Sequence, residues 1–272
     1  MALPISNSRI RLPQGQIFWR EVGQGPTLVF LHGSWSDSSQ WISVVNRLSK
    51  DYHCFAPDLL GFGDSECPQV NYSIELEVEC LAEFLETLNQ RQVYLIGHSL
   101  GGWIAASYAL KYPDLVSGLV LLAPEGLSDQ KVRKHGWWTR FLLGRSSLLF
   151  WLLRSLQSLA SLLGQQEKFK RTSEYWQQRL KSPTACQLLW QRDKSEIEAE
   201  LLQEKLEWLK VPVLILQGGQ DAPTAIATSK TYANLTPAAK YHIIDKGGNN
   251  LPQEFPQQVA QCISDFINSY EL

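Results

Sequence analysis

The sequence lacks the features that mark several classes of protein. Its five cysteines are scattered, with no C-x-x-C pair and no Cys/His cluster, which argues against a disulfide framework and a zinc site. It has no block of basic residues and its net charge is −2, so we expect no nucleic-acid partner. No apolar run reaches the roughly 18 residues of a membrane-spanning helix. A reducing compartment, by default the cytoplasm, is therefore predicted.

What is present is enough apolar sequence for one large domain, or for one domain with an insertion. Of the 272 residues, 44% are hydrophobic and 19% are charged, a balance that favours a folded chain over a disordered one. The start of the chain, MALPISNSRIRLPQGQ, contains no apolar segment of the kind that a signal peptide needs.

Continuous apolar runs recur along the chain and alternate with segments of helical spacing. Helical spacing is found over residues 73–90 and 101–112, the first with Ser73 as its predicted N-cap. Buried strands are predicted from the apolar runs at 27–33, 53–61, 93–99, 118–124, 211–219 and 240–245. This alternation predicts an α/β fold with a doubly wound, mostly parallel sheet, whose ligands bind at the carboxyl ends of the strands.

Residues 126–208 interrupt this rhythm. They contain no convincing strand but much helix-forming sequence, including a stretch rich in Leu and Trp at 135–164 and an amphipathic stretch at 194–209. We therefore predict an α/β core made of residues 1–125 and 209–272. Residues 126–208 are predicted to form a helical insertion between two strands of that core.

The sequence Gly97-His98-Ser99-Leu100-Gly101 fits the motif G-x-S-x-G, directly after a predicted strand and before a helix of small residues. In that setting a sharp turn lifts the serine above the sheet, and side chains in place of the glycines would clash. The following helix N-terminus directs N–H groups at developing negative charge. The motif indicates that Ser99 is a catalytic nucleophile. The alternative is a tight turn with an incidental serine.

A second motif, His-Gly-Ser-Trp at residues 32–35, follows another predicted strand. In the same architecture, an N–H just after the His-Gly pair and the N–H after the nucleophile together form an oxyanion hole. We assign these two donors to the backbone of Ser34 and Leu100. His32 is expected to be a structural, hydrogen-bonded histidine. His98 and Trp35 are expected to line the elbow and contact the substrate.

Three segments resemble the α/β-hydrolase superfamily in order and spacing: FLHGSW (30–35), PDLLGFGDS (57–65) and LIGHSLGGWIA (95–105). The resemblance covers nearly the whole chain, with residues 126–208 in the place of the family's variable lid. It implies a mostly parallel eight-stranded sheet and a triad whose nucleophile, acid and histidine follow one another along the chain. Asp58, in the second segment, is expected to cap and order its loop rather than to act in catalysis.

The resemblance offers two positions for the acid of the triad. Asp221, after the strand at 211–219, matches the family pattern and is favoured. Glu125, after the preceding strand, occupies the position that haloalkane dehalogenases use, and is otherwise expected to line the pocket or anchor the lid. The histidine should lie in a segment G-H-x-x-x-x-E-x-P. Residues 248–256 match this segment except that Asn249 stands at the place of the histidine.

Asn249 changes what the chain is expected to do. An asparagine amide has no basic nitrogen near neutral pH, so it cannot take the serine proton and pass it to a leaving group. Three interpretations stay open. The one we favour, because the other motifs are intact, is a hydrolase disabled by a recent replacement of the histidine. The others are a naturally silent binding protein or receptor, and an enzyme in which His242 or His135 stands in.

The predicted lid gives the best indication of the substrate. Its apolar side chains, Trp137, Trp138 and Phe141 among them, partly cover the sheet, and their excess predicts a pocket for a long apolar chain or a surface that touches a membrane. A serine nucleophile excludes dehalogenase and epoxide-hydrolase chemistry. We therefore predict an esterase of a small lipophilic substrate, such as a long-chain acyl or phytyl ester. It would be loosely similar to chlorophyll dephytylase and would need no metal or organic cofactor.

Overall fold

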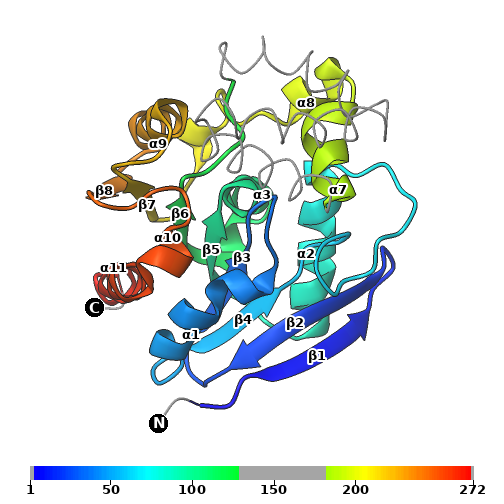
Figure 1. The fold of residues 1–272 in the computed structure, drawn as a ribbon, viewed down its shortest axis with the longest axis horizontal. Coiled ribbons are helices and arrows are strands. Elements are labelled where there is room, and N and C mark those ends of the chain that lie inside the picture. Colours follow the sequence, from blue (N-terminus) through cyan, green and yellow to red (C-terminus); the bar gives the residue numbers. More distant parts are fainter. Residues whose placement is uncertain (1–2, 129–181, 271–272) are drawn as a thin grey trace, which may run out of the picture. The chain divides into compact units, whose positions relative to one another are not determined.

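Eight strands pair into one sheet in the computed structural model, which describes residues 3–128 and 182–270 (Figure 1). Their order is β1-β2-β4-β3-β5-β6-β7-β8. Strands β1 and β2 pair antiparallel with their neighbours, and the other six run parallel to one another, which confirms the predicted α/β class. The strands are β1 Ser6–Arg11, β2 Gln16–Val22, β3 Thr27–Leu31, β4 His53–Pro57, β5 Val93–His98, β6 Val116–Leu122, β7 Val213–Gly218 and β8 Lys240–Ile244.

Helices cover both faces of this sheet (Figure 1). Helix α1 packs against α11 on one face, while α2 packs against α3 on the other. The helices are α1 Ile42–Leu48, α2 Ile74–Thr87, α3 Leu100–Lys111, α7 Pro183–Cys186, α8 Lys194–Glu200, α9 Pro223–Leu235, α10 Leu251–Glu254 and α11 Pro256–Asn268. Short helical turns are η1 Ser38–Trp41, η2 Pro113–Leu115, η3 Gln187–Gln191 and η4 Leu206–Trp208. As predicted, Ser73 caps α2, because its hydroxyl accepts a hydrogen bond from Leu76 N at 3.0 Å.

How deeply a strand is buried explains whether its sequence shows the apolar run from which a strand is predicted. Strands β5 and β7 are buried along their whole length, and they read as unbroken apolar runs. Strand β1, SNSRIR, lies at the sheet edge with every residue at least partly exposed. Its polar sequence gave no apolar run, and neither did that of β2, QIFWREV, where charged residues follow the apolar ones. Both strands were therefore missed by the analysis of apolar runs.

The chain divides into two compact units, residues 1–128 with 198–272, and residues 129–197. In the second unit the structure describes α7, η3 and the start of α8. Residues 129–181, which hold most of the predicted lid, lie outside the described residues, so the lid stays a prediction. Within the described part of the chain, no helix combines the length and apolar composition needed to cross a bilayer.

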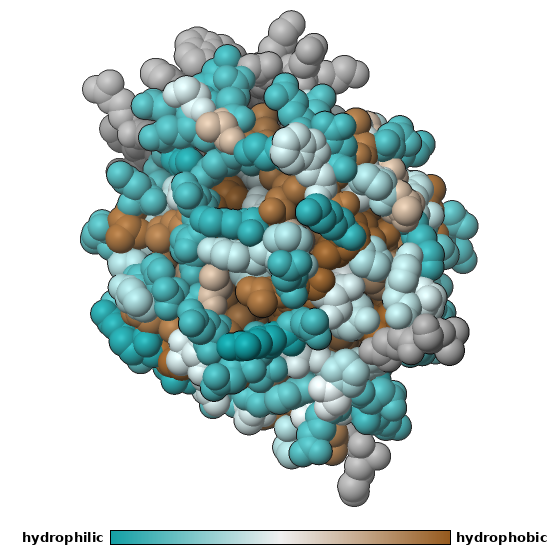
Figure 2. Space-filling model, turned by 180° about the vertical axis from the view of Figure 1, so that it is seen from behind, coloured by the Kyte–Doolittle hydropathy of each residue, from teal (hydrophilic) through white to brown (hydrophobic). Residues whose placement is uncertain are grey.

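The surface seen in Figure 2 is mostly hydrophilic, with hydrophobic residues showing in patches between the polar ones. The most exposed large apolar side chain among the described residues is Trp208, at 71%. Its indole N–H donates a hydrogen bond to Glu207 at 3.0 Å. Every folded protein keeps much apolar area at its surface, so we assign no binding role to these scattered side chains.

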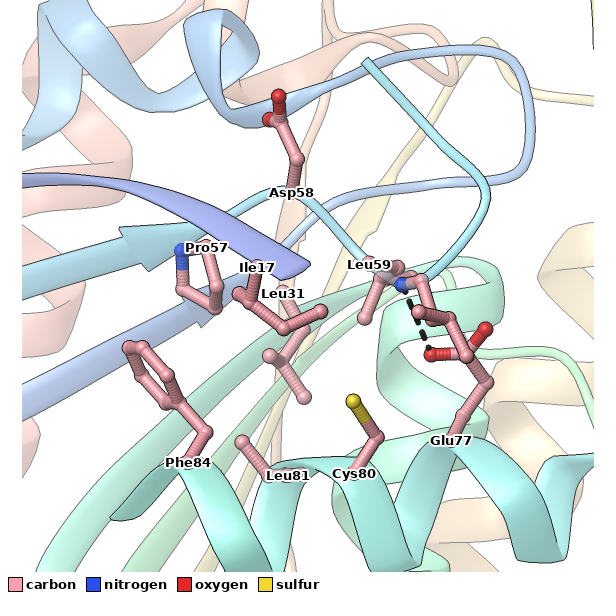
Figure 3. A pocket seen from close by; sticks show the side chains of 10 residues that line it. Ile17, Leu31, Pro57, Asp58, Leu59, Glu77, Cys80, Leu81 and Phe84 are labelled. Atoms are coloured by element: carbon pink, nitrogen blue, oxygen red, sulfur yellow. Dashed lines mark hydrogen bonds between the residues drawn. The ribbon is translucent and has the colours of Figure 1, made fainter. Parts of the chain in front are cut away.

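A carboxyl group is buried between α2 and the loop that follows β4. Glu77 is 1% exposed and accepts one hydrogen bond, from Leu60 N at 3.3 Å (Figure 3). Its other oxygen has no hydrogen-bond partner among the described residues, and the small pocket beside it is lined by apolar side chains such as Ile17 and Phe84. Burial raises the pKa of Glu77 to about 8, although the bond from Leu60 opposes the shift. At neutral pH this side chain is therefore mostly protonated.

Replacing Glu77 with glutamine should remove a pH dependence of stability. Between the ordinary glutamate pKa and about 8, the folded protein holds a proton on Glu77 that the unfolded chain has lost. The free energy of unfolding therefore falls as pH rises through this range, by up to about 4 kcal/mol. Urea unfolding at pH 5, 6, 7 and 8 should show a flatter profile for Glu77→Gln. The exposed Glu86 of α2 offers a matched control, Glu86→Gln, which should keep the original slope. An equal slope in all three proteins would contradict the assignment.

Candidate active site

Ser99 occupies a strained turn between β5 and α3. Its backbone has φ +53° and ψ −112°, a region that residues with side chains rarely adopt. The turn is held by hydrogen bonds at both of its backbone groups. Ser99 N donates to Leu122 O at 2.9 Å, and Ser99 O accepts from Gly102 N at 3.0 Å and Glu125 N at 3.1 Å. This is the geometry expected of a nucleophile elbow, and it sets the hydroxyl at the carboxyl ends of the parallel strands.

The two glycines of the motif allow the turn to close on itself. A Cβ at Gly97 would lie 2.3 Å from the carbonyl oxygen of Gly101. A Cβ at Gly101 would lie 2.3 Å from the carbonyl oxygen of Leu31, in the neighbouring strand β3. Both distances are far below van der Waals contact with backbone atoms that have no room to move. The spacing G-x-S-x-G is thus a packing requirement at this position.

The loop after β3 lies directly against the elbow. A Cβ at Gly33 would be 3.4 Å from the Cβ of Ser99, so the two backbones are close neighbours. Ser34 follows, 1% exposed, and Leu100 is the first residue of α3. Among residues 3–128 and 182–270, neither the Ser34 N–H nor the Leu100 N–H donates a hydrogen bond. Two backbone donors beside Ser99 are therefore available to a ligand, as an oxyanion hole requires.

His32 and His98, the two histidines near the elbow, each use both ring nitrogens in hydrogen bonds. Gln40 accepts from Gly33 N at 3.1 Å through its oxygen, so its amide N–H groups face His98 Nδ1, 2.7 Å away. His98 Nε2–H then donates to the backbone oxygen of Asn249 at 2.9 Å. Burial lowers the pKa of His98 to about 4, which keeps the ring neutral. His98 thus ties the elbow to the loop of residue 249. Its predicted contact with the substrate stays a prediction.

His32 and Asp58 hold the neighbouring loops together. His32 Nδ1–H donates to Gly33 O at 2.9 Å, and its Nε2 accepts from Leu59 N at 3.0 Å. Burial also lowers the pKa of His32. Asp58 accepts from two backbone N–H groups, Ser38 N at 2.6 Å and Asp64 N at 2.7 Å, and it points away from the pocket in Figure 3. Both side chains therefore have the structural roles expected from the sequence.

Asp221 and Asn249, which the sequence analysis predicts at the acid and histidine positions of a triad, are joined by a hydrogen bond. Asn249 Nδ2 donates to Asp221 Oδ2 at 3.3 Å. The same carboxylate accepts from Gln217 Nε2 at 3.1 Å and from Ala222 N at 2.7 Å. The carboxylate is thus held in place, and the amide of Asn249 occupies the side on which an imidazole N–H would donate. Asn249 itself is exposed, with no hydrogen bond to Ser99 among the described residues.

The second candidate acid, Glu125, contacts the serine directly. Ser99 Oγ–H donates to Glu125 Oε1 at 2.8 Å. The backbone of Glu125 is also fixed, because its N–H donates to Ser99 O and its carbonyl accepts from the hydroxyl of Tyr232 in α9. From the sequence, Glu125 is expected at the pocket, but nothing in its motif predicts this contact with Ser99. The described contacts thus join Glu125 to Ser99 and Asp221 to Asn249.

Of the remaining predicted site residues, the structure describes Trp35. Trp35 is half-buried in the loop after β3, next to Ser34. Trp137, Trp138 and Phe141 lie outside the described residues, and their contact with substrate stays a prediction. In the described part of the chain, no three His, Cys, Asp or Glu side chains are grouped so as to hold a metal ion.

Comparison with known proteins shows one family and several relatives that are named lipases. Residues 26–256 match the protein family described as alpha/beta hydrolase fold. A monoacylglycerol lipase of Xenopus laevis, abhd6-A, is 27% identical over 92% of this chain and 77% of its own length. Its human counterpart, ABHD6, is 26% identical over 91% of this chain and 77% of its own length. An uncharacterized protein of Mycobacterium tuberculosis is 34% identical over 40% of this chain, and the match spans only 32% of that protein.

Solved structures share the fold. A putative lipase from Acinetobacter baumannii superimposes with a TM-score of 0.77 at 23% identity, covering 98% of this chain and 92% of that one. An esterase from Thermogutta terrifontis gives a TM-score of 0.75 at 21% identity, covering 98% of this chain and 100% of that one. At these identities the likeness establishes the fold and nothing finer.

Replacing Gly97 with alanine should destabilise the protein. The added Cβ would lie 2.3 Å from the backbone oxygen of Gly101, so the strand and helix must move apart. We expect a loss of about 1–3 kcal/mol, measured by urea unfolding. Gly248→Ala is a matched control in the loop after β8, because the nearest atom to its Cβ would be Glu254 Oε2 at 3.7 Å. Equal stabilities for the two variants would mean that the elbow is not closed as tightly as described.

Proposed function

Because this chain belongs to the alpha/beta hydrolase fold family, we propose that it is a serine hydrolase acting on carboxylic esters. The observation that carries the proposal is the elbow itself. Ser99 sits at positive φ beside the two available N–H groups of Ser34 and Leu100. A serine strained in this way between a buried strand and a helix N-terminus is built to present its hydroxyl to an electrophile.

In the proposed reaction, Ser99 Oγ attacks the ester carbonyl and the oxyanion is held by the N–H groups of Ser34 and Leu100. Collapse of the tetrahedral intermediate breaks the bond to the alcohol and leaves an acyl-enzyme. Water then attacks the acyl group, releases the acid and restores the serine. Each half of the reaction needs a group that takes a proton and returns it. Asp221 is held in position to orient an imidazole for that task.

Asn249 supplies no such imidazole, and we propose that the chain is strongly impaired for this reason. Its amide donates to Asp221 and has no basic nitrogen. A hydrolase that has lost a triad member still keeps a residual rate from its oxyanion hole and from binding, roughly 10³–10⁴-fold over water. The proposal is therefore a slow esterase rather than an inert protein.

The proposed substrate is lipophilic, an ester with a long acyl or phytyl chain. Two features support this class. Relatives that align over most of this chain are named monoacylglycerol lipases. The predicted lid at 126–208, with Trp137 and Trp138, is rich enough in apolar residues to cover a long chain or to touch a membrane surface.

Asn249 also favours a second candidate function. A chain on this fold without a histidine at that position would bind an ester or acid and release it unchanged. The oxyanion donors and the apolar lid would then serve recognition, as in a ligand-binding protein or receptor. The two candidates differ in what happens when the histidine is supplied, because only a hydrolase gains turnover.

Replacing Asn249 with histidine should raise ester hydrolysis by at least about 100-fold, because the new imidazole would be oriented by Asp221. The measurement is hydrolysis of p-nitrophenyl esters from acetate to palmitate. Adding Ser99→Ala to Asn249→His should abolish the gain. The rate should rise with acyl chain length if the pocket is apolar.

Asn250 offers a matched control for this gain. It is exposed and adjacent in the same loop, so Asn250→His places an imidazole nearby without the contact to Asp221. We expect no comparable gain from it. If Asn249→His hydrolyses none of the esters while still binding long-chain fatty acids, the ligand-binding function is the correct one.

A further inference from the structure

The hydroxyl of Ser99 is not left without an acceptor when the histidine is absent. It donates to Glu125 Oε1 at 2.8 Å. We propose that Glu125 is the general base of this chain as it stands, taking the proton of Ser99 directly in place of the missing imidazole. The inference rests on the proposed esterase function and deepens it, because it names the residue that would sustain the residual reaction.

The position of this carboxylate is built into the backbone. Ala123 and Gly126 on either side of it both have positive φ, +42° and +98°, so the chain turns sharply after β6. A Cβ at Gly126 would lie 2.5 Å from the ring of Trp103, which fixes that turn against α3. The carbonyl of Glu125 is held by the buried hydroxyl of Tyr232, which is 0% exposed. The side chain therefore reaches Ser99 from a rigid support, as a catalytic group requires.

Glu125 also makes a reciprocal contact with the nucleophile. Its N–H donates to the backbone oxygen of Ser99, and its carboxylate accepts from the Ser99 hydroxyl. The two residues are thus joined at the main chain as well as at the side chain. A base whose own backbone is bonded to the nucleophile keeps its distance during the reaction, so proton transfer needs no rearrangement.

Among the described residues, the other candidates for the base are occupied or distant, and His135 lies outside those residues. His32 and His98 use both of their ring nitrogens in hydrogen bonds. His53 begins β4, at the amino end of the strand, and pairs with Glu21 at 2.8 Å. His242 is exposed on the edge strand β8. Among residues 3–128 and 182–270, Glu125 is the titratable side chain that is hydrogen-bonded to Ser99.

The proposed step balances. As Ser99 Oγ bonds to the ester carbon, its proton moves to Glu125 Oε1, and the carbonyl π electrons move to the oxygen held by Ser34 and Leu100. When the intermediate collapses, the carbon–oxygen bond to the alcohol breaks and Glu125 returns the proton to the departing oxygen. In the second half, Glu125 takes a proton from the attacking water and returns it to Ser99 Oγ as the acid leaves.

A glutamate is a weaker base than a histidine for this purpose. An ordinary glutamate carboxyl has a pKa about two units below that of imidazole, so it drives proton removal from a serine less strongly. Glu125 should therefore sustain a slow reaction, well below that of the Asn249→His variant. The competing reading is that Glu125 only holds the hydroxyl in place and so restrains Ser99. The two readings predict opposite effects when the carboxylate is neutralised.

The test measures the slow, Ser99-dependent hydrolysis of p-nitrophenyl butyrate by the full chain carrying Asn249. Glu125→Gln keeps the shape and an acceptor oxygen but cannot take a proton, and we expect it to lower this rate at least tenfold. Glu125→Ala should lower it similarly, and added formate should restore part of its activity in proportion to formate concentration. Formate should not rescue Glu125→Gln, where the amide still fills the site. Rescue of this kind is a readout that a merely structural role would not give.

Control variants distinguish a failure of the Glu125 assignment from a failure of the proposed esterase function. Glu86→Gln, at an exposed position of α2, is the matched charge change, and thermal melting of all variants shows that they are folded. If Glu125→Gln is as fast as the unsubstituted chain or faster, or if formate rescues nothing, Glu125 is not the base. If Asn249→His shows Ser99-dependent turnover but the unsubstituted chain shows none, this inference and the residual rate of the unsubstituted chain are both overturned, while the assignment of Ser99 as an esterase nucleophile stands. If no variant shows Ser99-dependent turnover, the esterase function fails and this inference fails with it.

Discussion

The close approach of Gly97, Gly101 and the carbonyl of Leu31 is the constraint on which the rest of the site depends. Because neither glycine carries a side chain, strand β5 can turn into α3 within one residue, and the packing leaves no room for a Cβ at either position. That residue is Ser99, which takes the strain at positive φ. The same turn frees the N–H of Leu100 and brings the loop after β3 alongside. The positions of the proposed nucleophile and of the two proposed oxyanion donors, and the contact to Glu125, all follow from this one piece of packing.

Much of this arrangement could be predicted from the sequence, and the reasons for the failures are physical. The buried parallel strands appear as apolar runs, and short motifs predict the turn at Ser99 and single out Asp221 and Asn249, whose catalytic roles stay predictions. Strands β1 and β2 were missed because polar and charged residues interrupt their apolar character at the edge of the sheet. The contact between Ser99 and Glu125 was beyond reach for another reason. It depends on the left-handed turns at Ala123 and Gly126, and an alanine in a sequence gives no sign of positive φ.

In the proposed mechanism, two tasks that one triad normally joins fall to separate residues. Asp221, with its three donors, is prepared to orient a side chain at position 249. Glu125 holds the serine. In an enzyme with a histidine at 249, the imidazole would join these two halves, and Glu125 would compete with it for the serine proton. The level of activity would then depend on whether the Ser99 hydroxyl donates to the imidazole or to Glu125. The turn after β6 sets this preference, because it fixes the position of Glu125.

The hydrogen bond from His98 reaches the backbone oxygen of residue 249 and makes no use of its side chain. The loop is consequently anchored in the same way whatever residue stands there. A substitution at this position therefore leaves this backbone anchor in place, and an asparagine codon becomes a histidine codon by a single base change. A single base change could therefore remove or restore the proposed proton shuttle while the bond from His98 still holds the loop.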